Sequence, residues 1–173
     1  MKFATSLVQT HFKSPLGDLI AAATDKGLAG LWFDDQRHLP PELTGAAVWR
    51  TADDHPLLKR TVNQLEEYFT GTRTTFDLPL DLSHGTAFQQ SVWQALLAIA
   101  HGDTASYGQI SARIGNPAAV RAVGAAVGRN PVSIIVPCHR VMGADGSLTG
   151  YAGGLHRKTA LLTLEGVFEE TIL

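Results

Sequence analysis

The sequence predicts an α+β protein with two domains. Short β-like runs separated by turn-forming residues fill the first third of the chain, and apolar residues follow helical spacing after residue 86. Between these regions lies "DLSHGT", residues 81–86, which is rich in turn formers. We therefore expect a small N-terminal antiparallel sheet domain with one helix over residues 1–85, and a mainly helical C-terminal domain over residues 86–173.

The composition is typical of a globular protein that buries a real core. Of the 173 residues, 45% are hydrophobic and 17% are charged. No apolar run reaches the length of a signal h-region or a membrane span. A lone cysteine excludes an internal disulfide and a Cys-rich zinc site. We expect a cytoplasmic monomer with no membrane association, no metal and no cofactor.

The N-terminal domain is expected to begin with three strands, "SLVQTHF", "LIAAAT" and "LAGLWF", joined by turns at "SPLGD" and "DKG". A helix follows, with Pro56 in its first turn and Gly71 after its end. Its apolar stripe is formed by Leu58, Val62, Leu65 and Phe69. The alternating segment "TTFDLPLDL" predicts one more strand.

The C-terminal domain is expected to contain three helices before its cysteine. Capping boxes at Thr86 with Gln89 and at Ser106 with Gln109 predict the first two helix starts. Asn116 is predicted to cap the third helix, which ends before Gly128. Because the second and third helices are short and separated by "GN", they predict a helix-turn-helix.

The third helix has two distinct faces. Its valine stripe, expected to face the core, consists of Val120, Val123 and Val127. Its outer face is low and carries Ala118, Ala122 and Ala125, with Arg121 and Arg129 on or beside it. Residues 105–160 hold six basic residues and one acidic residue, a local net charge of +5 in a chain of net charge −2. This pattern favours weakly sequence-specific binding in a nucleic-acid groove, and the alternative is that the alanines are simply good helix formers.

The only cysteine of the chain, Cys138, lies in "IIVPCHRV". Pro137 ends the β-like run "SIIV", so we expect the thiol where a strand emerges. His139 is a plausible base for it. Neighbouring residues on a strand point to opposite faces, so a direct bond between them requires a turn or a bridging water. The alternatives are an inert core thiol, a thiol protease and a metal site, but the histidines show no ligand spacing and no protease signature surrounds the cysteine.

Three segments carry a resemblance to a known family: "SYGQISARIGNPAAVRAVG", "NPVSIIVPCHRV" and "GYAGGLHRKTALLTLEG". Together they resemble the O6-alkylguanine-DNA alkyltransferases, also called methylated-DNA–protein-cysteine methyltransferases. The resemblance covers about residues 86 to 166 and is loose over residues 1–85. It implies a DNA repair protein that irreversibly moves the alkyl group of O6-alkylguanine, and of O4-alkylthymine in some cases, from duplex DNA to its own cysteine. The alternatives are a non-catalytic marker module for alkylated DNA, whose known examples lack the cysteine, and a thiol hydrolase.

The resemblance also implies roles for individual residues. Cys138 is the alkyl acceptor, His139 acts on it through a water, and Glu165 orients the imidazole. Arg121 takes the place of the flipped nucleotide, which must leave the stack before it can react. The alanine face lies in the minor groove.

Further residues are implied around the flipped base. Tyr107 crowds the target phosphate and donates to guanine N3, and Asn130 holds the turn before the active-site segment. The substrate pocket is implied to use the carbonyls of Cys138 and Val141 together with Tyr151, Ala152 and Gly153. Two departures from relatives affect the expected lesion range: Ala152 replaces a serine and Ser133 replaces a proline. Some members bind zinc through N-terminal cysteines, which this chain lacks.

Overall fold

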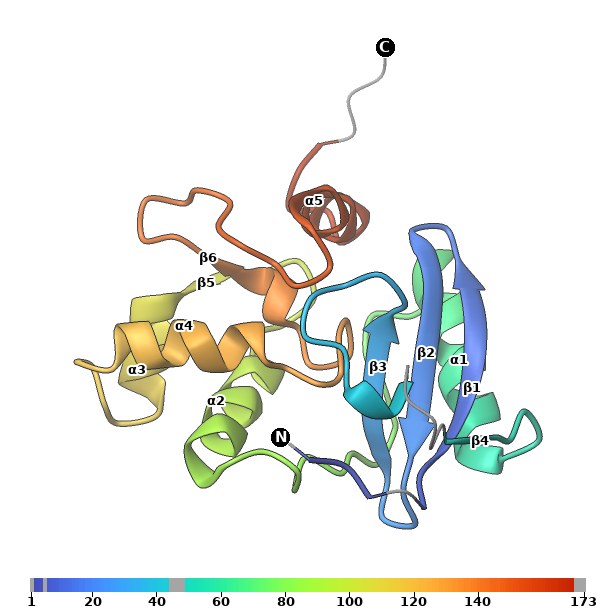
Figure 1. The fold of residues 1–173 in the computed structure, drawn as a ribbon. Helices are drawn as coiled ribbons and strands as arrows, with labels where there is room; N and C mark the ends of the chain where they lie inside the picture. Colours follow the sequence, from blue (N-terminus) through green and yellow to red (C-terminus); the bar gives the residue numbers. More distant parts are fainter. Residues whose placement is uncertain (1, 5, 44–48, 170–173) are drawn as a thin grey trace. The chain divides into compact units, whose positions relative to one another are not determined.

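The computed structural model describes residues 2–4, 6–43 and 49–169, and the chain divides into two compact units, Met1–Thr86 and Ala87–Leu173 (Figure 1). The first unit holds a mainly antiparallel sheet and one α-helix, and the second holds the remaining α-helices. The predicted α+β class is confirmed. No helix in the described residues is long and apolar enough to cross a membrane.

The first unit is built on a four-stranded sheet with strand order β3-β2-β1-β4 (Figure 1). Its strands are β1 (Val8–Ser14), β2 (Gly17–Ala23), β3 (Leu28–Phe33) and β4 (Arg50–Thr51). Neighbours β1, β2 and β3 pair antiparallel, as the sequence predicted, while the short β4 pairs parallel to β1. A 3-10 turn, η1 (Pro41–Leu43), lies between β3 and β4. Every residue of β3 and the last five residues of β2 are buried, so side chains on both faces of these strands are covered.

Helix α1 (Pro56–Phe69) contacts β1 and β2. Leu58 and Leu65 are fully buried, as their spacing predicted. Val62 and Phe69 are only half-buried, because Tyr68 lies on the side of the helix that faces the core. The buried stripe of α1 is therefore rotated slightly from the predicted one.

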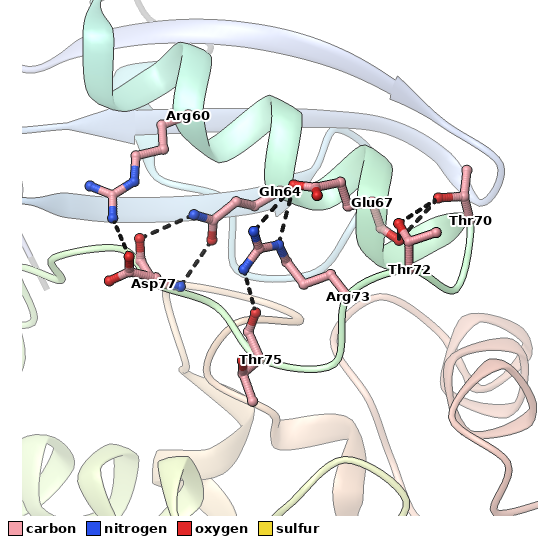
Figure 2. A network of polar contacts seen from close by, with 8 residues as sticks. All are labelled: Arg60, Gln64, Glu67, Thr70, Thr72, Arg73, Thr75 and Asp77. Carbon is pink, nitrogen blue, oxygen red and sulfur yellow. Dashed lines mark hydrogen bonds and ion pairs between the residues drawn. The ribbon is translucent and has the colours of Figure 1, made fainter.

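The expected strand "TTFDLPLDL" is wrong. Among the described residues, this segment forms only one isolated bridge, between Leu80 and Leu28. Pro79 has no N–H to donate to a ladder, and Gly27 approaches its backbone closely. The segment is instead fixed to α1 by side chains (Figure 2).

The contact between α1 and residues 70–77 centres on Gln64 (Figure 2). Its buried amide donates to the backbone oxygen of Asp77 at 3.2 Å and accepts from the Asp77 N–H at 2.9 Å. Two ion pairs lie on the outside, Arg60 with Asp77 at 2.8 Å and Arg73 with Glu67 at 3.3 Å. A side chain of α1 therefore supplies the backbone hydrogen bonds that a neighbouring strand would otherwise provide.

In its described residues, the second unit has four α-helices and two short strands. They are α2 (Ala87–Leu97), α3 (Tyr107–Arg113), α4 (Val120–Gly128), α5 (Leu155–Leu164) and a short parallel pair, β5 (Ala105–Ser106) with β6 (Val141–Met142). Trp93 of α2 is fully buried, and its indole N–H donates to the carbonyl of Ala126 in α4 at 2.9 Å. The predicted capping box at Ser106 and Gln109 is confirmed, with both reciprocal bonds present. Helices α3 and α4 contact each other as the predicted helix-turn-helix.

Helix α4 begins later than the sequence predicted. Asn116 accepts a bond from Ala119 in a separate turn, so the helix starts at Val120 rather than at residue 117. The expectation that Val120 faces the core is wrong, since 41% of it is exposed. Val123 and Val127 are buried. Only the two later valines reach the core, because Val120 is the first residue of α4 and its side chain is partly exposed to solvent.

The expected strand before the cysteine is also wrong. Residues 133–135 form a turn in which Ile134 has a φ of 73°, a left-handed conformation that is rare for a β-branched residue. Cys138 is the first residue of a 3-10 turn, η2 (Cys138–Arg140). The apolar run is buried in the domain core, but it follows turns and bends rather than an extended strand. This turn removes the expected problem that residues 138 and 139 would point to opposite faces.

Candidate active site

Cys138 lies in an environment that holds its thiol neutral. Its residue is 6% exposed, and its own N–H is bonded to the carbonyl of Val136. Burial raises the pKa of Cys138, while a hydrogen bond from Asn130 and the charge of Lys158 act in the opposite direction. The thiol therefore needs a base to become a nucleophile at neutral pH.

Asn130 joins the end of α4 to the turn that carries the cysteine. Its amide donates to the carbonyl of Val136 at 2.7 Å, and its oxygen accepts from the N–H of Val132 at 2.9 Å. The residue is 5% exposed, so water does not replace these bonds. One buried side chain therefore fixes both sides of the irregular turn.

The next residue along the chain, His139, is bound to the end of α5. Its Nε2 lies 2.8 Å from Oε2 of Glu165, the residue that follows the last turn of α5. Neither side chain is exposed. Because the carboxylate accepts from Nε2–H, the neutral imidazole presents a lone pair at Nδ1, which has no hydrogen-bond partner among the described residues.

Arg140 binds the same carboxylate. Its Nε lies 2.7 Å from Oε1 of Glu165, a terminal nitrogen lies 3.0 Å from Oε2, and the other donates to the carbonyl of Ile99 at 2.6 Å. A bidentate guanidinium keeps Glu165 ionised although its side chain is fully buried. The positive charge of Arg140 also offsets the negative charge of Glu165, so protonated His139 is stabilised less.

These charges keep His139 available as a base. Burial lowers the pKa of His139, Glu165 raises it, and the positive charges of Arg140 and Lys158 lower it further. An imidazole that is neutral at physiological pH can accept a proton at Nδ1. The arrangement suits proton removal from a neighbouring thiol.

Two tyrosines lie in segments near the cysteine. Tyr107, at the start of α3, is half-buried, and its hydroxyl lies 2.8 Å from Oγ1 of Thr149. Burial raises the pKa of Tyr151 well above its ordinary value, and a hydrogen bond with Ser133 opposes this effect. The Tyr151 phenol therefore stays protonated and can donate a hydrogen bond.

The predicted pocket residues lie on β6 and on the segment before α5. Val141 is buried, and its carbonyl accepts from Lys158 at 2.6 Å. Ala152 is half-buried, and Gly153 is buried with its carbonyl bonded to Arg157. Their short side chains leave backbone groups as the polar features of this segment.

The predicted nucleic-acid face is exposed. The outer positions on and beside α4 that the sequence assigned to this face are Ala118, Arg121, Ala122, Ala125 and Arg129, and all are exposed. The expected basic surface is smaller than the sequence count, because three of its six cations are buried: Arg140, Arg157 and Lys158. The exposed positive charge belongs to Arg113, Arg121 and Arg129.

Sequence reasoning missed the internal roles of two cations. Arg140 and Lys158 were counted as surface charge, yet they contact Glu165 and the Val141 carbonyl. Arg140 had one signal in the sequence, since it directly follows a buried apolar run and precedes Val141. Lys158 had none, because other polar residues of the same helix, His156 and Thr159, are exposed. In the described residues, no group of three His, Cys, Asp or Glu side chains is arranged to hold a metal ion.

Two family matches cover most of the chain. Residues 87–167 match "6-O-methylguanine DNA methyltransferase, DNA binding domain", and residues 7–82 match "6-O-methylguanine DNA methyltransferase, ribonuclease-like domain". The methylated-DNA–protein-cysteine methyltransferase of Mycobacterium tuberculosis strain H37Rv is 50% identical over 152 residues, covering 88% of each chain. The protein of the same name from Haemophilus influenzae is 42% identical over 164 residues, covering 94% of this chain and 88% of the relative.

Solved structures give the same result. The O6-methylguanine methyltransferase of M. tuberculosis superposes with a TM-score of 0.82 at 47% identity, covering 92% of each chain. A structure of the M. tuberculosis protein in complex with DNA superposes with a TM-score of 0.80, again at 47% identity over 92% of each chain. The same family is indicated by both matched regions, by the identity over nearly the full length and by the buried Cys138 site. The chain belongs to the methylated-DNA–protein-cysteine methyltransferase family.

Proposed function

We propose that this protein repairs DNA by transferring the alkyl group from O6 of guanine in duplex DNA to Sγ of Cys138, once per molecule and irreversibly. The observation that carries this function is the buried thiol followed by an imidazole that is held by Glu165 at 2.8 Å, in a chain of this family. No cofactor takes part, because the acceptor is a side chain of the protein itself.

The reaction uses His139 as the base and Cys138 as the nucleophile. The free Nδ1 of His139 takes the thiol proton through one water molecule. The thiolate then attacks the alkyl carbon in line, so that the S–C bond forms as the C–O6 bond breaks. Guanine leaves with the electron pair and takes up one proton at N1, which the imidazolium returns. The products are a neutral thioether and normal guanine.

The remaining site residues act on the leaving base. Tyr107 donates to N3 of guanine, which disperses the negative charge that develops during departure. The carbonyls of Cys138 and Val141 accept from the exocyclic amine, and Tyr151 forms one wall. The backbone at Ala152 and Gly153 faces O6, with no side-chain hydroxyl to assist. Asn130 holds the acceptor segment in place through its bonds to Val132 and Val136.

The DNA-binding face is the outer side of the helix-turn-helix. Ala118, Ala122 and Ala125 give it a low surface that lies in the minor groove. Arg121 fills the stack in place of the extruded nucleotide, and Arg129 contacts phosphate. Such contacts bind duplex DNA with little sequence preference, which suits a repair protein that must act wherever a lesion occurs.

Both parts of this work belong to one of the two domains. The C-terminal domain, residues 86–173, carries the DNA-binding face and the acceptor, and the N-terminal domain is residues 1–85. The protein acts as a monomer in the cytoplasm, where a reducing environment keeps the single thiol free.

Intact-protein mass spectrometry tests this function. Mixing the protein with a duplex oligonucleotide containing O6-methylguanine should add the mass of one methylene, and peptide mapping should locate it on Cys138. The Cys138→Ala variant should show no gain. Retained binding without a mass change would support a marker module, and repeated product formation beyond one equivalent would support a hydrolase.

A further inference from the structure

Lys158 is a buried cation without a carboxylate partner. It lies on α5, its side chain is fully buried, and no ion pair joins it to a carboxylate among the described residues. Its Nζ donates to the carbonyl of Val141 at 2.6 Å and to the carbonyl of Thr149 at 3.2 Å. Burying a charge with neutral partners alone is costly, so this arrangement calls for a compensating function.

Another buried cation, Arg140, is satisfied differently. Arg140 forms a bidentate pair with Glu165, so its charge is balanced within the ground state of the protein. Lys158 has only carbonyl dipoles in that state. The charge of Lys158 is therefore available to an anion that forms during the reaction.

The two acceptors of Lys158 belong to the two segments that bound the proposed pocket. Val141 follows the turn that carries Cys138, and Thr149 lies two residues before Tyr151. The side chain of Thr149 also contacts the hydroxyl of Tyr107. One ammonium thus joins α5, β6 and the pocket segment, and it fixes the direction in which the Val141 carbonyl points.

The charge of Lys158 acts on the acceptor. Burial raises the pKa of Cys138, and the positive charge of Lys158 opposes this shift; burial lowers the pKa of Lys158, and the Cys138 thiolate opposes that one. The other titratable and charged groups that act on this site are His139, Arg140, Tyr151, Arg157 and Glu165. Of these, Glu165 is already paired with Arg140 and His139.

We propose that Lys158 is a positioning residue for alkyl transfer: its ammonium ties the acceptor segment to the pocket segment through Val141 and Thr149, and its charge stabilises the Cys138 thiolate. The inference rests on the proposed function for its substrate, but the effect of the lysine charge on the thiol does not require DNA. Stabilisation of this kind favours the reactive anion over the resting thiol, which is the form of interaction that accelerates a reaction. It vanishes when the sulfur becomes a neutral thioether.

The single cysteine permits a direct test. The far-ultraviolet absorbance of a thiolate, followed against pH, reports Cys138 alone once the Cys138→Ser signal is subtracted. Lys158→Met should move the titration midpoint upward by about 1 pH unit or more. Lys158→Arg, which keeps the charge, should stay near the wild-type midpoint. Arg113→Met removes an exposed positive charge from the same domain and should leave the midpoint unchanged.

Transfer to an O6-methylguanine duplex provides the second measurement. Lys158→Met should react about 10-fold more slowly at neutral pH and recover at higher pH, because about 1 pH unit corresponds to a tenfold change in thiolate. A wild-type titration midpoint in folded Lys158→Met would overturn the proposal. If Lys158→Met shifted the midpoint as expected but the wild-type protein gained no mass from DNA, the proposed function would be overturned. The effect of Lys158 on the thiol would still stand.

A reciprocal measurement covers the case in which Lys158→Met does not fold. The chain has five lysines, and Lys158 is the one in the C-terminal domain. Nuclear magnetic resonance of isotope-labelled lysine side chains should show that Cys138→Ser lowers the pKa of Lys158, because its anionic partner is gone. An unchanged Lys158 pKa in Cys138→Ser would exclude the interaction.

Discussion

His139 and Glu165 meet with Nε2 and Oε2 at 2.8 Å, and neither side chain is exposed. They are separated by 26 residues and belong to different elements, η2 and the end of α5. The carboxylate fixes the imidazole tautomer and leaves Nδ1 as the proposed acceptor for the thiol proton. The same carboxylate neutralises Arg140, so its replacement has two separable effects.

Glu165→Gln should slow alkyl transfer while DNA binding stays near the wild-type level. Losing the negative charge lowers the basicity of His139, so the thiol ionises less readily at neutral pH. We expect a rate loss of about 10²-fold or less, which higher pH partly restores because Cys138 then ionises unaided. Single-turnover kinetics on an O6-methylguanine duplex across pH measures it. An unchanged rate would remove Glu165 from the mechanism.

The same variant should also lose stability, because Arg140 is left buried without its anion. The expected loss is about 3–5 kcal/mol in the free energy of unfolding, measured with denaturant. Arg140→Met is the matched control, since it breaks the ion pair but keeps the carboxylate beside the imidazole. If both variants lost stability and rate in equal proportion, Glu165 would serve the fold alone.

His139→Ala should cost more than Glu165→Gln, about 10²- to 10⁴-fold in transfer rate, because it removes the base itself. Raising the pH should recover part of this loss. Quantifying thioether formation over time at several pH values tests the prediction. A variant that reacts at the wild-type rate at neutral pH would show that the thiol is activated without His139.

Stability should depend on pH through two buried groups. Burial lowers the pKa of His139, so its contribution is complete above about pH 6.5, the ordinary value for histidine, and is lost as the pH falls through the lower folded value. Burial raises the pKa of Cys138, so its contribution is complete below about pH 8.5 and is lost as the pH rises through the higher folded value.

Denaturant titrations across this range separate the two groups. Relative to wild type, His139→Gln should reduce the acid loss of stability, and Cys138→Ser should reduce the alkaline loss. Parallel curves for wild type and both variants would contradict the assignment.

Arg121→Ala should weaken repair of duplex DNA much more than reaction with free O6-alkylguanine base. The arginine is exposed on α4, and its proposed role is to hold the extruded state, whose formation costs a few kcal/mol. We expect a loss on the order of 10-fold or more on duplex substrate. Arg113→Ala removes another exposed cation as a control. Equal losses on both substrates would refute the role, and repeating the assay across salt concentrations separates a phosphate contact.

Gln64→Ala should destabilise the first unit by about 1–3 kcal/mol, because the backbone N–H and carbonyl of Asp77 lose their partner (Figure 2). Arg60→Ala removes the neighbouring exposed ion pair and should cost less than about 1 kcal/mol. Amide hydrogen exchange of residues 70–80 compares the two variants in the full chain. Similar exchange in both would show that the buried amide does not hold this segment.

Much of this protein is determined by local sequence. The three strands, the capping box at Ser106 and the helix-turn-helix follow from alternation, side-chain-to-backbone bonds and helical spacing, which act over a few residues. Resemblance identified Cys138, His139 and Glu165: the first two are adjacent in the sequence, whereas Glu165 lies 26 positions after His139 in a separate segment. The predicted start of α4 was wrong because a turn at Asn116 precedes the helix. The predicted strand after α1 was wrong because the side-chain amide of Gln64, and not a neighbouring strand, binds the backbone of Asp77.

Tertiary structure alone decided which charges are buried. A sequence counts Arg140 and Lys158 with the surface cations. The apolar residues around Arg140 are a signal of burial, whereas nothing next to Lys158 distinguishes a solvated side chain from one that crosses the core. Only the fold brings the end of α5 to the turn at Cys138, where a carboxylate meets Arg140 and two carbonyls meet Lys158. The desolvation of these groups, which sets the pKa of the thiol and of the imidazole, depends on packing between segments that are distant in the chain.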